Sequence, residues 1–191
     1  SPMTIAYKLA GETLLEHLES NPTEVQIGLA TIAETTARFA YAALEAGAHG
    51  IFFASQFSRA EMLSEEHCLS FVVRYDLIAL ERVKAEPVPL VLHLHGENIY
   101  FDTVNQYPVH AVSWHNHETG PTLEAAMALT DKTLMTGLDR KLLESGQPEL
   151  ILSQAEAAIK KTGGRRLILA PACVIPTNAP LENLEALTKI N

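Results

Sequence analysis

The chain has 191 residues, of which 47% are hydrophobic and 19% charged, so it carries enough apolar material for a globular core. Its formal net charge of -9 disfavours nucleic acid and anionic membranes as partners, because both require clusters of Lys and Arg. No apolar run approaches the roughly 20 residues that cross a bilayer, and no basic segment followed by an apolar one opens the sequence. We therefore expect a cytoplasmic protein, and its two distant cysteines are too few for a disulfide scaffold.

Five short apolar runs alternate with longer segments of helical period. Their hydrophobicity is continuous rather than alternating, which predicts strands that are covered on both faces, as in a parallel sheet flanked by helices. The predicted strands are residues 50–55, 89–95, 111–114, 133–138 and 166–170.

Capping residues delimit the helices. Asn21, followed by a proline, begins one helix, and Gly47 ends it. Ser64 begins a second helix, in which Leu69 and Leu77 are expected to face the core. Two further helices are predicted over 148–162, ended by Gly163 and Gly164, and from Asn178 or Ala179 onward, with Pro180 in its first turn.

Repeated βα units of this size are typical of an open doubly wound sheet or of a (β/α)8 barrel. No glycine-rich fingerprint follows any predicted strand, which weakens the dinucleotide-binding version. A complete barrel typically needs about 250 residues. With five predicted strands, this α/β chain would form only part of one.

Polar residues at strand ends are the candidates for chemistry, because ligands gather at the carboxyl ends of parallel strands in both folds. His93 and His95 end the second strand two residues apart, so both rings should lie on the same side. Cys173 follows the last strand. These three residues match the ligand count of a catalytic zinc site, with Glu97 or His115 as a fourth. The alternative is ordinary polar lining and a small buried cysteine.

Three other strand ends carry weaker candidates. Trp114 and His115 follow the third strand and could line a flat ligand, although Trp114 is equally expected in the core. Asp139 and Arg140 follow the fourth strand, where a structural ion pair between them is the favoured interpretation. Ser55 ends the first strand without an evident base beside it, which makes a serine nucleophile unlikely.

The segments GAHGIFFASQ, LSEEHCLSFVVRYDLIALERV, HLHGEN, GLDR and RLILAPACVIPTNAPLENLEAL resemble the C-terminal part of the uroporphyrinogen decarboxylase superfamily. The resemblance covers nearly the whole chain. Members of this superfamily are (β/α)8 barrels, so the resemblance implies that residues 1–191 are one domain with the last five βα units of a TIM barrel. It also implies a C-terminal fragment of a longer chain, lacking the first strands.

Two branches of the superfamily give different expectations. Decarboxylases act on a tetrapyrrole without metal or cofactor, and Ser55 matches their serine. Their tyrosine position falls at Lys8, with Tyr7 one residue away, and their late Gly-His-Gly is replaced by residues 172–174. Their arginine-rich and aspartate motifs have no counterpart in this chain.

The second branch consists of zinc-dependent, cobamide-linked methyltransferases, which hold zinc with a His-x-Cys and a later Cys. His93, His95 and Cys173 stand at the matching places, with histidine replacing the first cysteine. The resemblance implies that zinc activates a thiol, which then attacks a methyl group carried by a corrinoid.

The expected function is therefore zinc-dependent methyl transfer from a corrinoid to a thiol. The alternatives are a uroporphyrinogen decarboxylase and a non-catalytic partial barrel that binds a tetrapyrrole or a partner. Expected partners are the missing N-terminal part, a second copy of the chain, or a corrinoid protein, because an open barrel exposes sheet edges. The candidate residues are Ser55, Asp139 and His115 for catalysis, Trp114 and Asn98 for the cofactor, and His93, His95, Cys173 and Glu97 for the metal.

Overall fold

The computed structural model describes residues 1–190, and the chain divides into unit 1 (Ser1–His110) and unit 2, which begins at Ala111. Its five strands belong to one parallel sheet in the order β1 (Ile51–Ser55), β2 (Leu90–Leu94), β3 (Ala111–Ser113), β4 (Thr133–Leu138) and β5 (Leu167–Pro171). Helices alternate with these strands along the chain. The α/β prediction is therefore confirmed.

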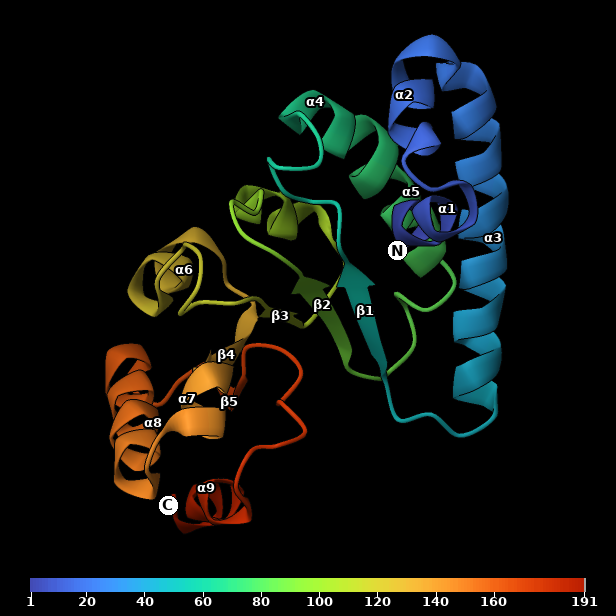
Figure 1. The fold of residues 1–191 in the computed structure, drawn as a ribbon. Helices are drawn as coiled ribbons and strands as arrows, with labels where there is room; N and C mark the ends of the chain where they lie inside the picture. The colour runs from blue at the N-terminus through green and yellow to red at the C-terminus, as the bar shows by residue number, and fades with distance from the viewer. Residues whose placement is uncertain (191) are drawn as a thin grey trace. The chain divides into compact units, whose positions relative to one another are not determined.

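In unit 1, the long helix α3 (Pro22–Glu45) packs against α1 (Pro2–Ala10), α2 (Thr13–Ser20) and α5 (Arg74–Leu80) (Figure 1). As predicted, α3 begins after Asn21 with a proline, and its buried residues, including Leu29 and Ala33, lie on one face. The helical elements of this unit are α1 (Pro2–Ala10), α2 (Thr13–Ser20), α3 (Pro22–Glu45), α4 (Glu65–His67), a π-helix (Cys68–Val73), α5 (Arg74–Leu80) and the 3-10 helix η2 (Phe101–Gln106).

The helix predicted from Ser64 onward is interrupted. Ser64 caps it as expected, since its hydroxyl accepts a hydrogen bond from the backbone N–H of His67 at 3.2 Å. The π-helix then widens the following turns and changes which residues face inward. Leu69, which was expected in the core, is 39% exposed, whereas Asp76 is fully buried.

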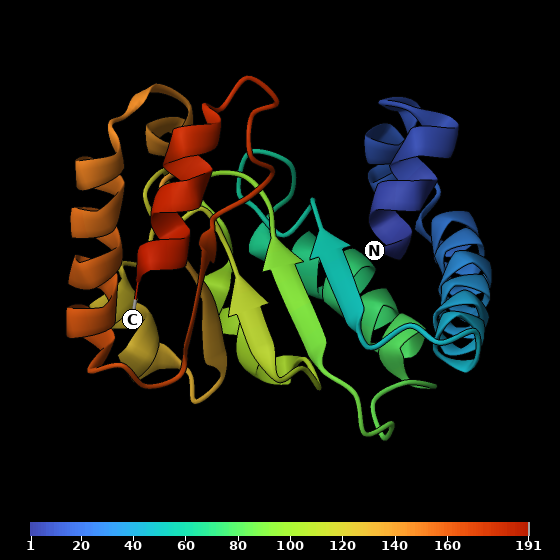
Figure 2. The ribbon, with the colours of Figure 1, turned by 90° about the horizontal axis from the view of Figure 1, so that it is seen from below.

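Strands β1 (Ile51–Ser55) and β2 (Leu90–Leu94) pair in parallel within unit 1 and lie within one residue of the predicted ends. Figure 2 shows the two strands, cyan and green, running side by side in the same direction. Side chains alternate along each strand, so Ala54 and His93, which stand opposite each other, share one face. Ser55 lies on the other face of β1.

Unit 2 holds the other three strands, and helix α8 packs against β4 and β5. The residues of α8 match the prediction, and Gly163 ends the helix in the left-handed conformation. The elements of this unit are β3 (Ala111–Ser113), α6 (Leu123–Leu129), β4 (Thr133–Leu138), α7 (Arg140–Ser145), α8 (Pro148–Thr162), β5 (Leu167–Pro171), α9 (Leu181–Ala186) and the 3-10 helix η3 (Leu187–Lys189).

The start of the last helix was predicted too early. A hydrogen bond from the backbone N–H of Ala179 to the carbonyl of Pro176 forms a turn there, and Pro180 has an extended ψ of 138° as the N-cap residue. Helix α9 therefore begins at Leu181. Within residues 1–190, no helix combines the length and apolar character needed to cross a membrane.

Candidate metal centre

In unit 1, the end of β2 carries two imidazoles on one side of the strand. The ring centroids of His93 and His95 are 5.8 Å apart, as the two-residue period of a strand predicts. The ring of His93 also stacks on Phe52 at 5.6 Å, and His93 is only 5% exposed. Packing against Phe52 therefore restricts the orientation of the His93 ring.

In unit 2, two more potential ligands follow strand ends. His115 lies two residues beyond β3 and is 3% exposed, and Cys173 lies two residues beyond β5 and is partly buried. The pKa of Arg140 is raised, mainly by its hydrogen bonds to Glu118 and in part by the nearby Cys173. A cationic side chain therefore lies close to the cysteine.

His93, His95, His115 and Cys173 each offer one ligand atom, and these four atoms lie within 4.8 Å of one another. Imidazole nitrogens and a thiolate sulfur are ligands that zinc commonly takes in proteins. The group could therefore bind a metal ion. Glu97, expected as a ligand, is exposed and lies outside this group, whereas His115, the other candidate for a fourth ligand, belongs to it.

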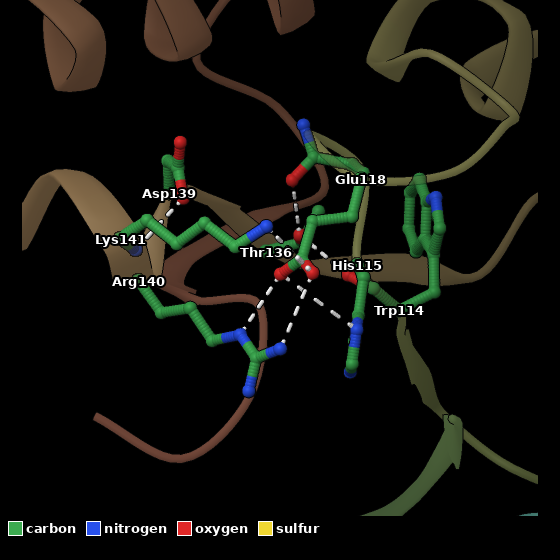
Figure 3. Close-up of polar contacts among 8 residues, drawn as sticks. Trp114, His115, Glu118, Thr136, Asp139, Arg140 and Lys141 are labelled. Atoms are coloured by element: carbon green, nitrogen blue, oxygen red, sulfur yellow. Dashed lines mark hydrogen bonds and ion pairs between the residues drawn. The ribbon is translucent and has the colours of Figure 1, made fainter. Parts of the chain in front are cut away.

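Glu118, which the sequence did not single out, is the centre of an ionic network beside His115 (Figure 3). Its carboxylate accepts hydrogen bonds from Arg140 at 2.8 and 3.2 Å and lies 3.4 Å from the ammonium of Lys141. The Arg140 hydrogen bonds are the largest cause that lowers the pKa of Glu118 to about 2. One oxygen of Glu118 lies 3.9 Å from Nδ1 of His115. In the sequence, the only indication of this contact was that Glu118 follows His115 by three residues.

The ion pair expected between Asp139 and Arg140 is not the arrangement found. Arg140 binds Glu118 instead, and Asp139 acts as the N-cap residue of α7, where its carboxylate accepts the backbone N–H of Lys141 at 2.8 Å (Figure 3). The capping geometry satisfies a backbone donor at the start of the helix, which an ion pair with the next residue would not do.

Trp114 lies in the core of unit 2. It is fully buried, and its indole N–H donates a hydrogen bond to the carbonyl of Pro121 at 3.0 Å. Figure 3 shows the indole of Trp114 and the imidazole of His115 pointing to different sides of the chain. The sequence left open whether Trp114 lines a flat ligand or belongs to the core, and this burial favours the core.

Ser55 is fully buried in unit 1, where its hydroxyl lies 3.1 Å from that of Ser58. Next to them lies Asp76, another residue that the sequence did not single out. Burial, the largest effect, raises the pKa of Asp76, and the hydroxyl of Tyr107 donates to its carboxylate at 2.8 Å. Ser55 belongs to this buried network.

Asn98 lies in the loop after β2 and is exposed. Its side-chain amide donates a hydrogen bond to Glu61, and its φ of 42° places the backbone in the left-handed region, which asparagine tolerates. The contact joins the loop after β2 to the loop after β1.

Comparison with solved structures gives the same fold. A B12-independent methionine synthase from Shewanella sp. W3-18-1, in complex with selenomethionine, superposes with a TM-score of 0.63 at 14% sequence identity. The match covers 88% of this chain and 55% of that protein, so the chain spans about half of its length. Five parallel βα units are consistent with part of a TIM barrel, as expected.

Comparison of sequences identifies the family. No curated protein sequence matches the chain. The family model for uroporphyrinogen decarboxylase (URO-D), however, matches residues 1–190, which is almost the full length. The chain belongs to the uroporphyrinogen decarboxylase family.

Proposed function

We propose that this chain carries the zinc site of a methyltransferase whose methyl acceptor is a thiol. The observation that carries the proposal is the grouping of His93, His95, His115 and Cys173, whose ligand atoms lie within 4.8 Å of one another. The family match also supports it, and the fold is like that of a protein named as a methionine synthase. That likeness, at 14% identity, supports the fold alone.

The proposed zinc ligands are His93, His95 and Cys173, the three residues that the family resemblance implies. Three protein ligands leave one coordination position open for a substrate, as catalytic zinc sites do. Zinc bound there would supply Lewis acidity that lowers the pKa of a substrate thiol. The stacking of His93 on Phe52 supports this assignment, because it holds one imidazole in a fixed orientation.

His115 is proposed as the residue that accepts the proton of the thiol. Its imidazole is almost fully buried, and one oxygen of Glu118 lies 3.9 Å from its Nδ1. Glu118 stays ionised down to a pH of about 2 because of its hydrogen bonds from Arg140. A carboxylate that is ionised at neutral pH therefore lies beside this imidazole.

The methyl donor implied by the family resemblance is a corrinoid, whereas the structural neighbour is named as B12-independent. Methylcobalamin is therefore one donor to test. An assay follows the loss of its absorbance in the presence of a thiol. A loss that requires both the protein and the thiol would support the corrinoid version of the proposal.

Metal content tests the site itself. Protein purified without chelators is expected to contain about one zinc per chain by elemental mass spectrometry, and His93→Ala and Cys173→Ser are expected to lose it. His49→Ala is the matched control, because His49 is an exposed loop histidine outside the group. Wild-type protein without zinc would contradict the proposal and leave a metal-free decarboxylase relative or a non-catalytic partial barrel. Equal zinc in all variants would also contradict it, because the metal would then be bound by other residues.

Metal-free decarboxylation has weaker support from the described residues. Ser55, the residue that matched the decarboxylases, is fully buried and lies within hydrogen-bonding distance of Ser58. It also lies on the face of β1 opposite to the face shared by Ala54 and His93. Direct contact between this hydroxyl and a large tetrapyrrole is therefore not favoured.

A further inference from the structure

Unit 2 contains a small pocket that is lined by residues of α6, α8 and the end of β4, and that shares no residue with the candidate metal centre. Its volume of about 130 Å³ is space for about four water molecules. Gly137 of β4 lines the pocket, and a Cβ atom there would lie 3.1 Å from the Cβ of Ala158 in α8. The pocket is therefore on the side of β4 that α8 covers.

Two side-chain amides line the pocket, and the oxygen of each already accepts a hydrogen bond from the end of β4. Oδ1 of Asn116 accepts the backbone N–H of Gly137 at 3.3 Å and the hydroxyl of Thr136 at 2.6 Å. Oε1 of Gln154 accepts the backbone N–H of Asp139 at 2.8 Å. A backbone N–H can only donate, so these contacts fix which end of each amide is the oxygen. The groups that the two amides leave for a ligand are therefore their NH₂ donors.

The other polar side chains of the lining add donors and no carboxylate. Lys161 is the only charged residue among them. Its ammonium lies 3.4 Å from Glu124, but both side chains are 51% exposed, so water screens this pair and the ammonium stays available to a ligand. Nε2 of His117 lies 3.1 Å from the carbonyl of Gly137 and carries the proton of that hydrogen bond, and Thr122 adds a hydroxyl. The lining therefore has a positive charge and an excess of donors.

Oxygen atoms of an ionised group accept several hydrogen bonds at once and bind more strongly to a cationic donor than neutral acceptors do. The lining offers this combination in the two NH₂ groups of Asn116 and Gln154 and the ammonium of Lys161. We propose that this pocket binds a small oxyanion, either a phosphate group or a carboxylate. The pocket has space for a group of this size. The proposal goes beyond the proposed function, because it depends on neither zinc nor a thiol.

Calorimetric titration with sodium phosphate and with sodium acetate, at pH 7 and constant ionic strength, tests the site. Gln154→Glu keeps an acceptor for the backbone N–H of Asp139 but replaces the NH₂ donor with a charged oxygen. It should weaken binding of the preferred ion at least about tenfold. Lys161→Met should weaken it about two- to fivefold. Gln106→Glu, the same chemical change at an exposed residue of unit 1, should leave the affinity unchanged.

A second measurement locates the bound ion. In protein enriched in ¹⁵N, the side-chain NH₂ signals of Gln154, assigned by their loss in Gln154→Glu, should shift in a saturable manner as the ion is added. Tighter binding of phosphate would identify a phosphate ligand, and tighter binding of acetate a carboxylate ligand. Absence of a saturable shift with both ions would overturn the proposal. Equal affinity in wild type and Gln154→Glu would also overturn it, and if that variant does not fold, equal affinity in Lys161→Met would do so.

Discussion

The guanidinium of Arg140 binds the carboxylate of Glu118 through two hydrogen bonds, from Nε at 2.8 Å and from Nη2 at 3.2 Å. Both side chains are less than a third exposed, so water weakens the pair only in part. Arg140→Gln should lower the free energy of unfolding at pH 7 by about 1–3 kcal/mol, because a largely buried carboxylate loses its main donors. Urea denaturation measures the change.

The same pair predicts a pH dependence. The pKa of Glu118 is about 2 in the folded chain and 4.5 as its ordinary value, so the ionised carboxylate stabilises the fold above pH 4.5. This stabilisation is lost as the pH falls toward 2, and the difference between wild type and Arg140→Gln should shrink over that range. Arg165→Gln, at an exposed arginine of unit 2, is the control. A difference that stays constant from pH 7 to pH 3 would contradict the assignment.

Two glycines are expected to respond to alanine with opposite signs. Gly137 in β4 has a φ of 111°, and a Cβ atom there would lie 3.1 Å from the Cβ of Ala158 in α8 and 3.1 Å from a methyl of Leu169. Gly137→Ala should therefore lower the free energy of unfolding by about 1–3 kcal/mol through strain and crowding.

Gly28 lies in the middle of α3, where a Cβ atom would meet nothing within 4 Å. Gly28→Ala should raise the free energy of unfolding by about 0.5–1 kcal/mol, because alanine restricts the unfolded chain and favours the helix. Denaturation of both variants in urea measures the two changes. A stabilising Gly137→Ala would show that α8 does not pack tightly on β4.

The sequence predicted the strands well because each is a continuous apolar run bounded by polar or turn residues. Strand β4 (Thr133–Leu138) has the predicted ends, and α8 is ended by Gly163 as expected. The π-helix was not predictable in this way, since one extra residue in a turn leaves no local signal in the hydrophobic pattern. Within the π-helix, Leu69 is 39% exposed, although the hydrophobic pattern predicted it in the core.

The sequence predicted the candidate site residues because they follow strand ends. It did not predict which side chains they contact. The positions of His93 and His95 follow from the strand period, whereas Glu118 became a site residue only through its contacts with Arg140 and His115. Glu118, which pairs with Arg140, is 22 positions away from it in the chain. Such contacts depend on tertiary packing, which a single sequence does not display.

Asp76 predicts a second pH dependence, with the opposite sign. Burial raises the pKa of this carboxyl above 3.8, so the folded state holds its proton more tightly than the unfolded state does. Stability is therefore lost as the pH rises from 3.8 through the raised pKa. Over that range, the free energy of unfolding of Asp76→Asn should increase relative to that of wild type. Urea denaturation at several pH values measures the difference.

The exposed Asp102→Asn is the matched control for this change, since it removes a carboxyl at the surface of the same unit. Tyr107→Phe tests the network from the other side. It removes the donor that lies 2.8 Å from Asp76 and should cost about 1–3 kcal/mol. If Asp76→Asn were less stable than wild type by a constant amount at every pH, a buried carboxyl with a raised pKa would be excluded.

His115 and Glu97, the two residues weighed as a fourth metal ligand, should behave differently when changed to alanine. If His115 accepts the thiol proton, His115→Ala should retain about one zinc per chain, while methylation of a test thiol such as 2-mercaptoethanol at neutral pH slows by about 10²–10⁴-fold. Glu97→Ala should change neither quantity, because Glu97 is exposed and lies outside the ligand group. Elemental mass spectrometry gives the zinc content, and methylcobalamin serves as the donor in the rate measurement. Loss of zinc from His115→Ala would instead make His115 a ligand and remove its proposed role as the proton acceptor.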